Sequence, residues 1–152
     1  VSLDWLLTGR GEPNKRAYVP VVGVVRASND DSITMSDPAG ELDEAPIPPG
    51  WTDKTVALEI HGYSQLGVAD DTWLAYYDDR RDPPTEDLIG RLCAVGTEDD
   101  RVLLKYLQPG NRAGYFDLES RNAPIMRDVR VLWAAPIKSL MPKWQARRIG
   151  LA

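Results

Sequence analysis

The chain has 152 residues, 43% hydrophobic and 27% charged, which suits one globular domain. Its formal net charge of −5 argues against a surface that binds nucleic acid, because such a surface needs clustered Lys and Arg. No apolar run reaches the roughly 20 residues that cross a bilayer, no signal peptide is recognisable, and the single Cys93 cannot form an internal disulfide, so a cytoplasmic location is expected.

The first residues predict the last turns of a helix. Leu3, Leu6 and Leu7 recur at helical spacing, and a glycine follows them. A helix this short is not stable alone in water, so residues 1–9 are expected to be the end of another domain. Residues 10–17 are polar, contain a proline and predict a linker.

After the linker, nearly every patterned segment predicts a strand. The segments are Tyr18 to Val25, Val56 to Ile60, Trp73 to Tyr77, Leu92 to Val95, Val102 to Leu107, Tyr115 to Leu118 and Val129 to Trp133. Turn-forming residues lie between them, at Asp82-Pro83-Pro84, Glu98-Asp99-Asp100, Pro109-Gly110-Asn111 and Asn122-Ala123-Pro124. Residues 29–51 are acidic and proline-rich, which predicts a long loop with one strand at Ile33 to Met35. The sequence therefore predicts a mostly β domain of several short, mainly antiparallel strands over residues 18–142.

Most familiar catalytic sets are missing. His61 is the single histidine, so a histidine-rich metal site is excluded. A Cys-His pair would need Cys93 to meet His61, but Cys93 lies in an apolar strand, where a buried, inert thiol is expected. Neither a Walker sequence nor a Gly-x-Gly-x-x-Gly motif is present, so no cofactor is indicated.

Ser64 is the candidate nucleophile. It follows the predicted strand that ends at Ile60, within residues 61–67, His-Gly-Tyr-Ser-Gln-Leu-Gly. Glycines on both sides let the backbone turn sharply and place the Ser64 hydroxyl at a strand end, near backbone N–H groups. The alternative interpretation is an ordinary turn serine.

Lys105 is the candidate base. Side chains alternate along a strand, so Lys105 shares one face with Leu103 and Leu107. Removal from water disfavours the charged ammonium, and such a lysine can supply a neutral amine as general base. The alternative interpretation is an edge-strand lysine whose head reaches water.

A serine with a neutral lysine is a recurring nucleophile–base pair that needs neither histidine nor aspartate. Gly62-Tyr63-Ser64-Gln65 and Leu104-Lys105-Tyr106 resemble, in order, the nucleophile and base segments of LexA, phage repressors and UmuD-like proteins. Three further segments resemble the same family: Phe116 to Pro124 its Leu-x-Ser-x-Asn-Pro segment, Val129 to Ile137 its closing strand, and Asp4 to Gly11 the end of its helix-turn-helix domain. The resemblance covers most of the chain and implies a signal-peptidase-like fold.

The resemblance also implies a substrate, which is the repressor's own chain. The family's cleavage site follows a Pro-x-x-Gly-x-Val strand and is usually Ala-Gly. Here Pro20 to Val25 matches that strand, and Ala27-Ser28 stands at the cleavage position. A literal Ala39-Gly40 lies downstream in the acidic loop without a preceding strand of this type, and is the second candidate.

The implied function is a homodimerising repressor domain whose Ser64 and Lys105 cut the linker on an SOS-type signal, with a RecA filament as trigger. Operator DNA would be bound by the N-terminal domain, and residues 143–152 would form a solvated tail. Tyr63 and Gln65 replace the family's usual Asp and Met, so the main alternative is a catalytically inactive dimerisation or partner-binding domain of a transcriptional regulator. A peptidase acting on other chains is a third reading, against which the absence of a membrane segment argues.

Overall fold

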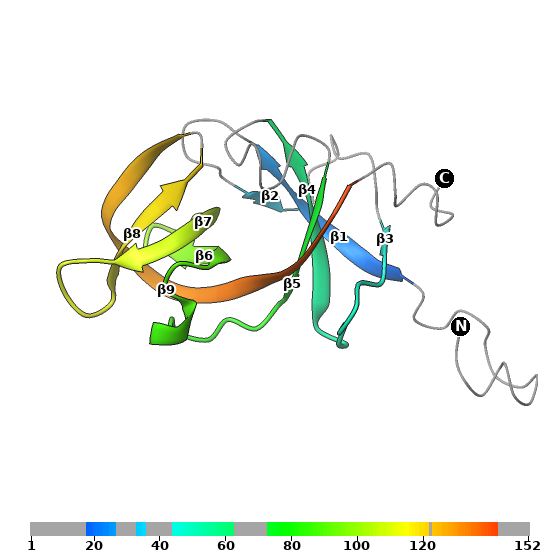
Figure 1. Cartoon of the computed structure of the whole chain (residues 1–152), viewed down its shortest axis with the longest axis horizontal. Helices are drawn as coiled ribbons and strands as arrows, with labels where there is room; N and C mark the ends of the chain where they lie inside the picture. The colour runs from blue at the N-terminus through cyan, green and yellow to red at the C-terminus, as the bar shows by residue number, and fades with distance from the viewer. Residues whose placement is uncertain (1–17, 27–32, 36–43, 63–72, 122, 143–152) are drawn as a thin grey trace, which may run out of the picture.

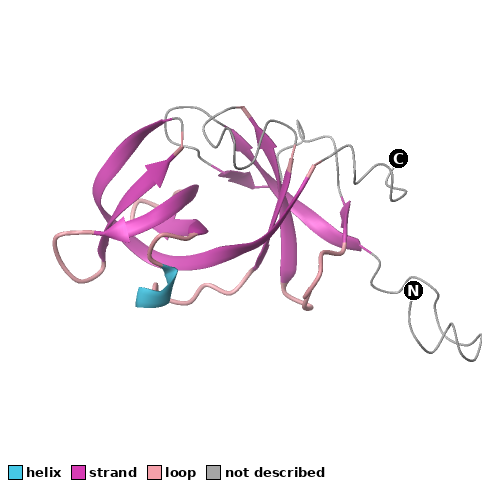
Figure 2. Cartoon of the chain, in the orientation of Figure 1, coloured by secondary structure: helices cyan, strands magenta, loops and turns pink. Residues whose placement is uncertain are grey.

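The computed structural model describes residues 18–26, 33–35, 44–62, 73–121 and 123–142 (Figure 1). Within these ranges it contains nine strands and one short 3-10 helix, so the prediction of a mostly β fold is confirmed (Figure 2). The elements are β1 Tyr18–Arg26, β2 Ile33–Met35, β3 Glu44–Pro46, β4 Thr55–His61, β5 Leu74–Asp78, η1 Glu86–Leu88, β6 Leu92–Thr97, β7 Val102–Pro109, β8 Tyr115–Ser120 and β9 Ala123–Met141. No helix in the described ranges is long and apolar enough to cross a membrane.

The strands form one connected sheet in the order β2-β1-β4-β5-β9-β6-β7-β8, and β3 adds to β1. The pairings are antiparallel except that between β1 and β4, which is parallel. The expectation of mainly antiparallel strands is therefore confirmed.

The long strand β9 joins two parts of the sheet. Its first half pairs with β8, and its second half pairs first with β6 and then with β5. Because β6, β7 and β8 also pair in sequence, these three strands and β9 close into a ring. Figure 1 shows β9, in orange to red, curving from this ring to the strands β5, β4 and β1.

Two predictions for the strands were incomplete. The predicted strand Val129 to Trp133 is the middle of the 19-residue β9. The predicted turn at residues 122–124 is wrong at its end, since Ala123 already pairs with Ser120. A positive φ of 54° at Asp128 and shifts in register let β9 bend while it stays paired.

The acidic loop contains one more strand than the sequence predicts. β2 has the predicted bounds of Ile33–Met35, but Glu44–Pro46 forms β3, which pairs with the start of β1. A three-residue strand that ends in proline carries no alternating pattern, so no local pattern predicts β3. The other residues of the loop between 36 and 43 lie outside the described ranges.

Three apolar clusters fill the described part of the molecule. The interior of the ring contains Leu88, Cys93, Val95, Leu103, Leu107, Leu118, Val131 and Ala134. A second cluster joins the outer face of β7 to β4 and β5, through Leu104, Ile60, Tyr77 and Trp133 among others. A third covers the opposite face of β4 and β5 and includes Ala57, Leu74 and Tyr76. β4 is thus covered on both faces.

Candidate active site

Lys105 is completely buried in the middle of the ring. Its strand β7 is paired on one side with β6 and on the other with β8, so it is not an edge strand. Leu103 and Leu107 belong to the ring interior and Leu104 to the cluster outside, as the predicted alternation requires. The alternative of an edge-strand lysine whose head reaches water is therefore wrong.

The Lys105 amine has a partner across the strand pairing. Its Nζ donates a hydrogen bond to Oγ of Ser120 over 2.8 Å. Tyr106 pairs with Glu119, and the next step of the same register brings Lys105 opposite Ser120, the last residue of β8. A buried amine without such partners would be strongly destabilising, so Ser120 both accommodates Lys105 and fixes where its Nζ lies.

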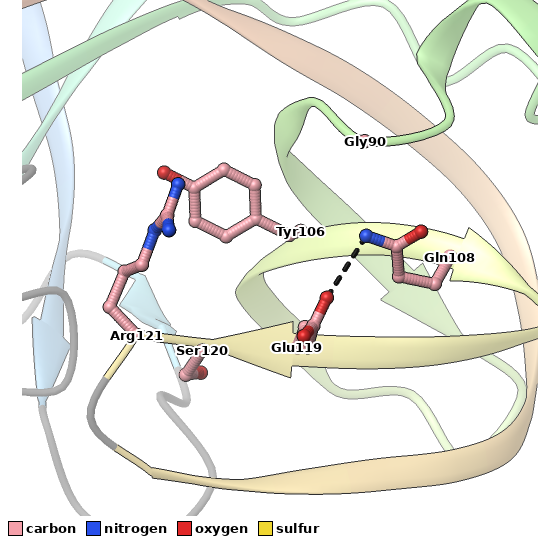
Figure 3. Close-up of a pocket in the computed structure, with 6 residues that line it drawn as sticks. All are labelled: Gly90, Tyr106, Gln108, Glu119, Ser120 and Arg121. Atoms are coloured by element: carbon pink, nitrogen blue, oxygen red, sulfur yellow. Dashed lines mark hydrogen bonds between the residues drawn. The ribbon is translucent and has the colours of Figure 1, made fainter.

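Ser120 also lines a small polar pocket on β7 and β8. The pocket has a volume of about 160 Å³ and is lined by Gly90, Tyr106, Gln108, Glu119, Ser120 and Arg121. The Gln108 amide donates a hydrogen bond to Glu119 over 2.9 Å, and Arg121 lies over the ring of Tyr106. Both contacts can be followed in Figure 3. The serine that holds the Lys105 amine is thus part of a pocket wall. Ser120 belongs to the segment Phe116 to Pro124, which resembles a segment of the LexA family, but no role was predicted for it.

The ends of β1 and β4 lie side by side. In their parallel pairing Val25 is opposite Ile60 and Arg26 is opposite His61. β2 pairs with the other edge of this end of β1 and also lies against β7 (Figure 1). The structure therefore brings together the strand that leads to the candidate cleavage site, the strand that leads to the candidate nucleophile and the strand that carries the candidate base.

The candidate residues beyond these strand ends are not among the described residues. Ser64 follows β4 by three residues, and Ala27 and Ser28 directly follow β1. The second candidate cleavage site, Ala39-Gly40, also lies outside the described ranges. The roles of these residues stay predictions.

A buried carboxylate lies beside the single histidine at the end of β4. Glu59 is completely buried, and its Oε2 lies 3.0 Å from Nε2 of His61, whose side chain is 27% exposed. From the sequence, His61 was a possible partner of Cys93, and no role was predicted for Glu59. The alternating pattern of β4 alone would place Glu59 on a polar, solvent-facing side of the strand. The apolar cluster that covers this side is formed by segments distant in the sequence, so the local pattern does not predict that Glu59 is buried.

Cys93 is an inert thiol rather than a nucleophile. It is buried in the ring interior, and its Sγ–H donates to the carbonyl oxygen of Arg91 over 3.4 Å. Burial raises the pKa of the Cys93 thiol to about 12, which the charge of Arg91 only partly offsets. His61 is hydrogen-bonded to Glu59 rather than to Cys93, so the structure does not support a Cys-His pair.

No group of three or more His, Cys, Asp or Glu in the described ranges is arranged to hold a metal ion. No family model matches the chain, and no curated protein matches it significantly. The resemblance to the LexA family thus depends on the ordered motifs of the sequence.

Proposed function

We propose that the chain is the C-terminal dimerisation and self-cleavage domain of a cytoplasmic, phage-type transcriptional repressor of the LexA kind. The observation that carries the proposal is the complete burial of Lys105 in a central strand, with its Nζ held by Ser120. A buried lysine destabilises a fold unless its amine is satisfied, and the chemistry that most needs an amine out of water is proton abstraction.

In the proposed reaction, the uncharged amine of Lys105 takes the proton of the Ser64 hydroxyl. The Ser64 Oγ then attacks the carbonyl carbon of Ala27, and backbone N–H groups near Ser64 stabilise the oxyanion. The bond from Ala27 to the nitrogen of Ser28 breaks, and the Lys105 ammonium returns its proton to that nitrogen. The ester between Ala27 and Ser64 is then hydrolysed by water, which frees both fragments.

The pairing of β1 with β4 supports cleavage of the chain's own backbone. Because the strands run parallel and Arg26 lies opposite His61, both chains leave the sheet at the same edge. Ala27-Ser28 directly follows Arg26, the last residue of β1, and Ser64 follows the last residue of β4 by three positions. Ala39-Gly40 instead follows β2, four residues beyond its last residue Met35, and is a weaker candidate.

Cleavage there would separate an N-terminal DNA-binding domain from the part that dimerises. A repressor dimer binds two half-sites together, so loss of the link between its DNA-binding domains lowers operator affinity strongly. The net charge of −5 supports placing DNA contacts outside this chain. A RecA filament is the proposed trigger, by resemblance to the family.

The proposal is tested by incubating residues 1–152 at rising pH, with and without activated RecA, and measuring fragment masses. Only an uncharged amine can accept the Ser64 proton, so cleavage should speed up as pH rises. We expect a cut between Ala27 and Ser28, giving 27 residues and the other 125 of 152, and no cut in Ser64→Ala or Lys105→Ala. A rate that does not depend on protein concentration would show cutting in cis. A chain that stays intact with RecA at high pH would refute self-cleavage and favour a non-cleaving dimerisation domain.

A further inference from the structure

Two arginines beside Tyr115 have no acidic partner among the described residues. Four other arginines each form an ion pair with an aspartate at 2.7 to 3.6 Å, namely Arg80, Arg81, Arg101 and Arg127. Arg112 and Arg130 are exposed, and neither forms an ion pair with a carboxylate of the described ranges. Their guanidinium carbons instead lie 3.8 and 5.8 Å from the centroid of the Tyr115 ring. A guanidinium held by an aromatic ring but without an anion keeps its N–H groups for a ligand.

The turn between β7 and β8 carries Arg112 and is held by backbone hydrogen bonds (Figure 1). The Tyr115 N–H donates to the carbonyl oxygen of Arg112 over 3.1 Å. The Val131 N–H donates to the carbonyl oxygen of Gly114 over 3.1 Å, which ties the turn to β9. A side chain at Gly110 would collide with the backbone of Tyr115, so the two ends of the turn are in close contact. The backbone therefore needs little further ordering when a ligand binds at Arg112.

An apolar hollow of about 540 Å³ lies beside Arg112. It is lined by Ile89, which follows η1, and by Pro109 and Phe116 of the β7–β8 hairpin. Its volume lies within the roughly 300–1,000 Å³ that is typical of ligand sites. Arg112 and Glu86 are the charged residues among those that line it. The hollow can thus accept an apolar side chain, with a cation in the same wall.

A second hollow, which Tyr115 also lines, contains acidic residues. It has a volume of about 520 Å³, and Arg130 lines it together with the carboxylates of Glu98, Asp99 and Asp128. These carboxylates and the net charge of −5 would repel a phosphate backbone, which disfavours a nucleic acid as the ligand. A peptide can instead direct a single carboxylate to an arginine and an apolar side chain to the first hollow.

We propose that the Tyr115 surface, made of Arg112, Tyr115, Arg130 and the apolar hollow, binds a segment of a partner protein that has a carboxylate next to an apolar side chain. The carboxylate accepts hydrogen bonds from Arg112, and the apolar side chain enters the hollow. A guanidinium binds a carboxylate through two parallel N–H···O bonds, which gives both affinity and orientation. Tyr115 and Ser120 are the two ends of β8, roughly 17 Å apart in an extended strand. The surface is therefore separate from the contact between Lys105 and Ser120, and the proposal does not depend on self-cleavage.

Selection from random peptides tests the proposal. The Ser64→Ala chain of residues 1–152, which the proposed reaction cannot cleave, is immobilised, and short random peptides displayed on phage are selected on it. We expect enriched sequences in which Asp or Glu adjoins Leu, Ile or Phe. A synthetic peptide of the enriched sequence should bind the chain in solution, as measured by fluorescence anisotropy. The same peptide with Asn or Gln in place of the acidic residue should bind more weakly.

Variants of the exposed arginines show whether the peptide binds at this surface. Arg112→Gln should weaken binding of the peptide by roughly 10- to 100-fold, the usual effect of losing a charge-assisted hydrogen bond. Arg130→Gln should weaken it in the same direction. Arg80→Gln is the matched control, because Arg80 is also exposed but is paired with Asp82, and it should leave the affinity unchanged. Urea unfolding checks that each variant is folded.

Other outcomes would overturn the proposal. Enriched peptides that bind Arg112→Gln as tightly as the parent chain would do so, as would a selection that enriches no acidic and apolar motif. Binding of single-stranded or duplex DNA through Arg112 and Arg130, without an enriched peptide, would assign the surface to a polyanion and refute a protein partner. A dimer that dissociates in Arg112→Gln, without an enriched peptide, would assign it to a second copy of the chain and refute a separate partner. Because the assay uses a chain that cannot cleave itself, none of these results bears on the Ser64–Lys105 proposal.

Discussion

Arg26 of β1 lies directly opposite His61 of β4, in the parallel pairing of the sheet. Each of these residues is the last of its strand. The chain that follows Arg26 and the chain that follows His61 therefore start from one edge, and the proposed substrate and nucleophile begin as neighbours. This pairing is what leads us to propose cleavage within one chain rather than between two.

Ser120→Ala should slow self-cleavage and destabilise the fold. The substitution leaves the Lys105 amine without the hydroxyl that now lies 2.8 Å from it, and loss of a partner from a buried polar group costs about 1–3 kcal/mol. Cleavage rate and the free energy of unfolding in urea measure the two effects. Ser120→Thr keeps a hydroxyl and should retain more of both. Wild-type behaviour of Ser120→Ala in both assays would show that Ser120 does not hold Lys105.

Removing both partners should be better tolerated than removing Ser120 alone. When a buried polar group such as the Lys105 amine and its half-buried hydrogen-bond partner are replaced together by apolar groups of similar shape, the change in stability is often near zero or favourable. We therefore expect Lys105→Met combined with Ser120→Ala to have a higher unfolding free energy than Ser120→Ala, with no cleavage. Urea titration of the four species of this cycle gives the coupling energy. Additive effects would contradict the interaction.

Bulk at the cleaved bond should separate the two candidate sites. A large side chain at Ala27 would keep the carbonyl from reaching Ser64, so Ala27→Trp should abolish cleavage. Ala39→Trp should cleave at the wild-type rate, and serves as the matched control. Fragment masses after incubation at high pH distinguish the cases. The opposite pattern would assign cleavage to Ala39-Gly40.

The stability of the protein in acid should depend on Asp78. Burial alone would raise the pKa of Asp78, but hydrogen bonds from Thr55 and Lys138 and the charge of Lys138 outweigh it, so the pKa lies below the usual 3.8. Thr55 Oγ1 lies 2.6 Å and Lys138 Nζ 3.0 Å from this carboxylate. Because the pKa is lower in the folded state, the stabilisation is present above the unfolded value and is lost as pH falls through the folded value.

Urea unfolding from pH 7 to pH 2 tests this linkage. Asp78→Asn should be less stable than wild type at pH 7, and the two should converge below about pH 4. The exposed Asp53→Asn should follow wild type throughout. A difference between Asp78→Asn and wild type that stays constant over the whole range would refute the linkage.

The sequence predicted most strands but not what holds them together. The alternating and valine-rich segments became β1 and β4 to β8, and the face of Lys105 followed from alternation alone. Strand β3 and the full length of β9 were missed, because both depend on pairing with distant segments rather than on local pattern. Ser64 and the cleaved bond stay predictions.

The contacts of the site were beyond prediction for the same reason. Ser120 meets Lys105 through the register of β7 and β8 across a hairpin. Glu59 is buried because β1 and β5 flank β4 and apolar clusters cover both of its faces. From one strand alone, Glu59 is indistinguishable from a solvent-facing glutamate, since alternation does not say which faces are covered.

The continuity of β9 has a consequence for how the molecule comes apart. The same strand closes the ring around Lys105 and completes the sheet that carries β4. We therefore expect that the ring and the sheet of β1, β4 and β5 cannot unfold separately. Hydrogen exchange should therefore give the amides of Lys105 and Ile60 the same opening free energy, that of global unfolding. The proposed base and the strand that leads to the proposed nucleophile would be lost together, in a single cooperative event.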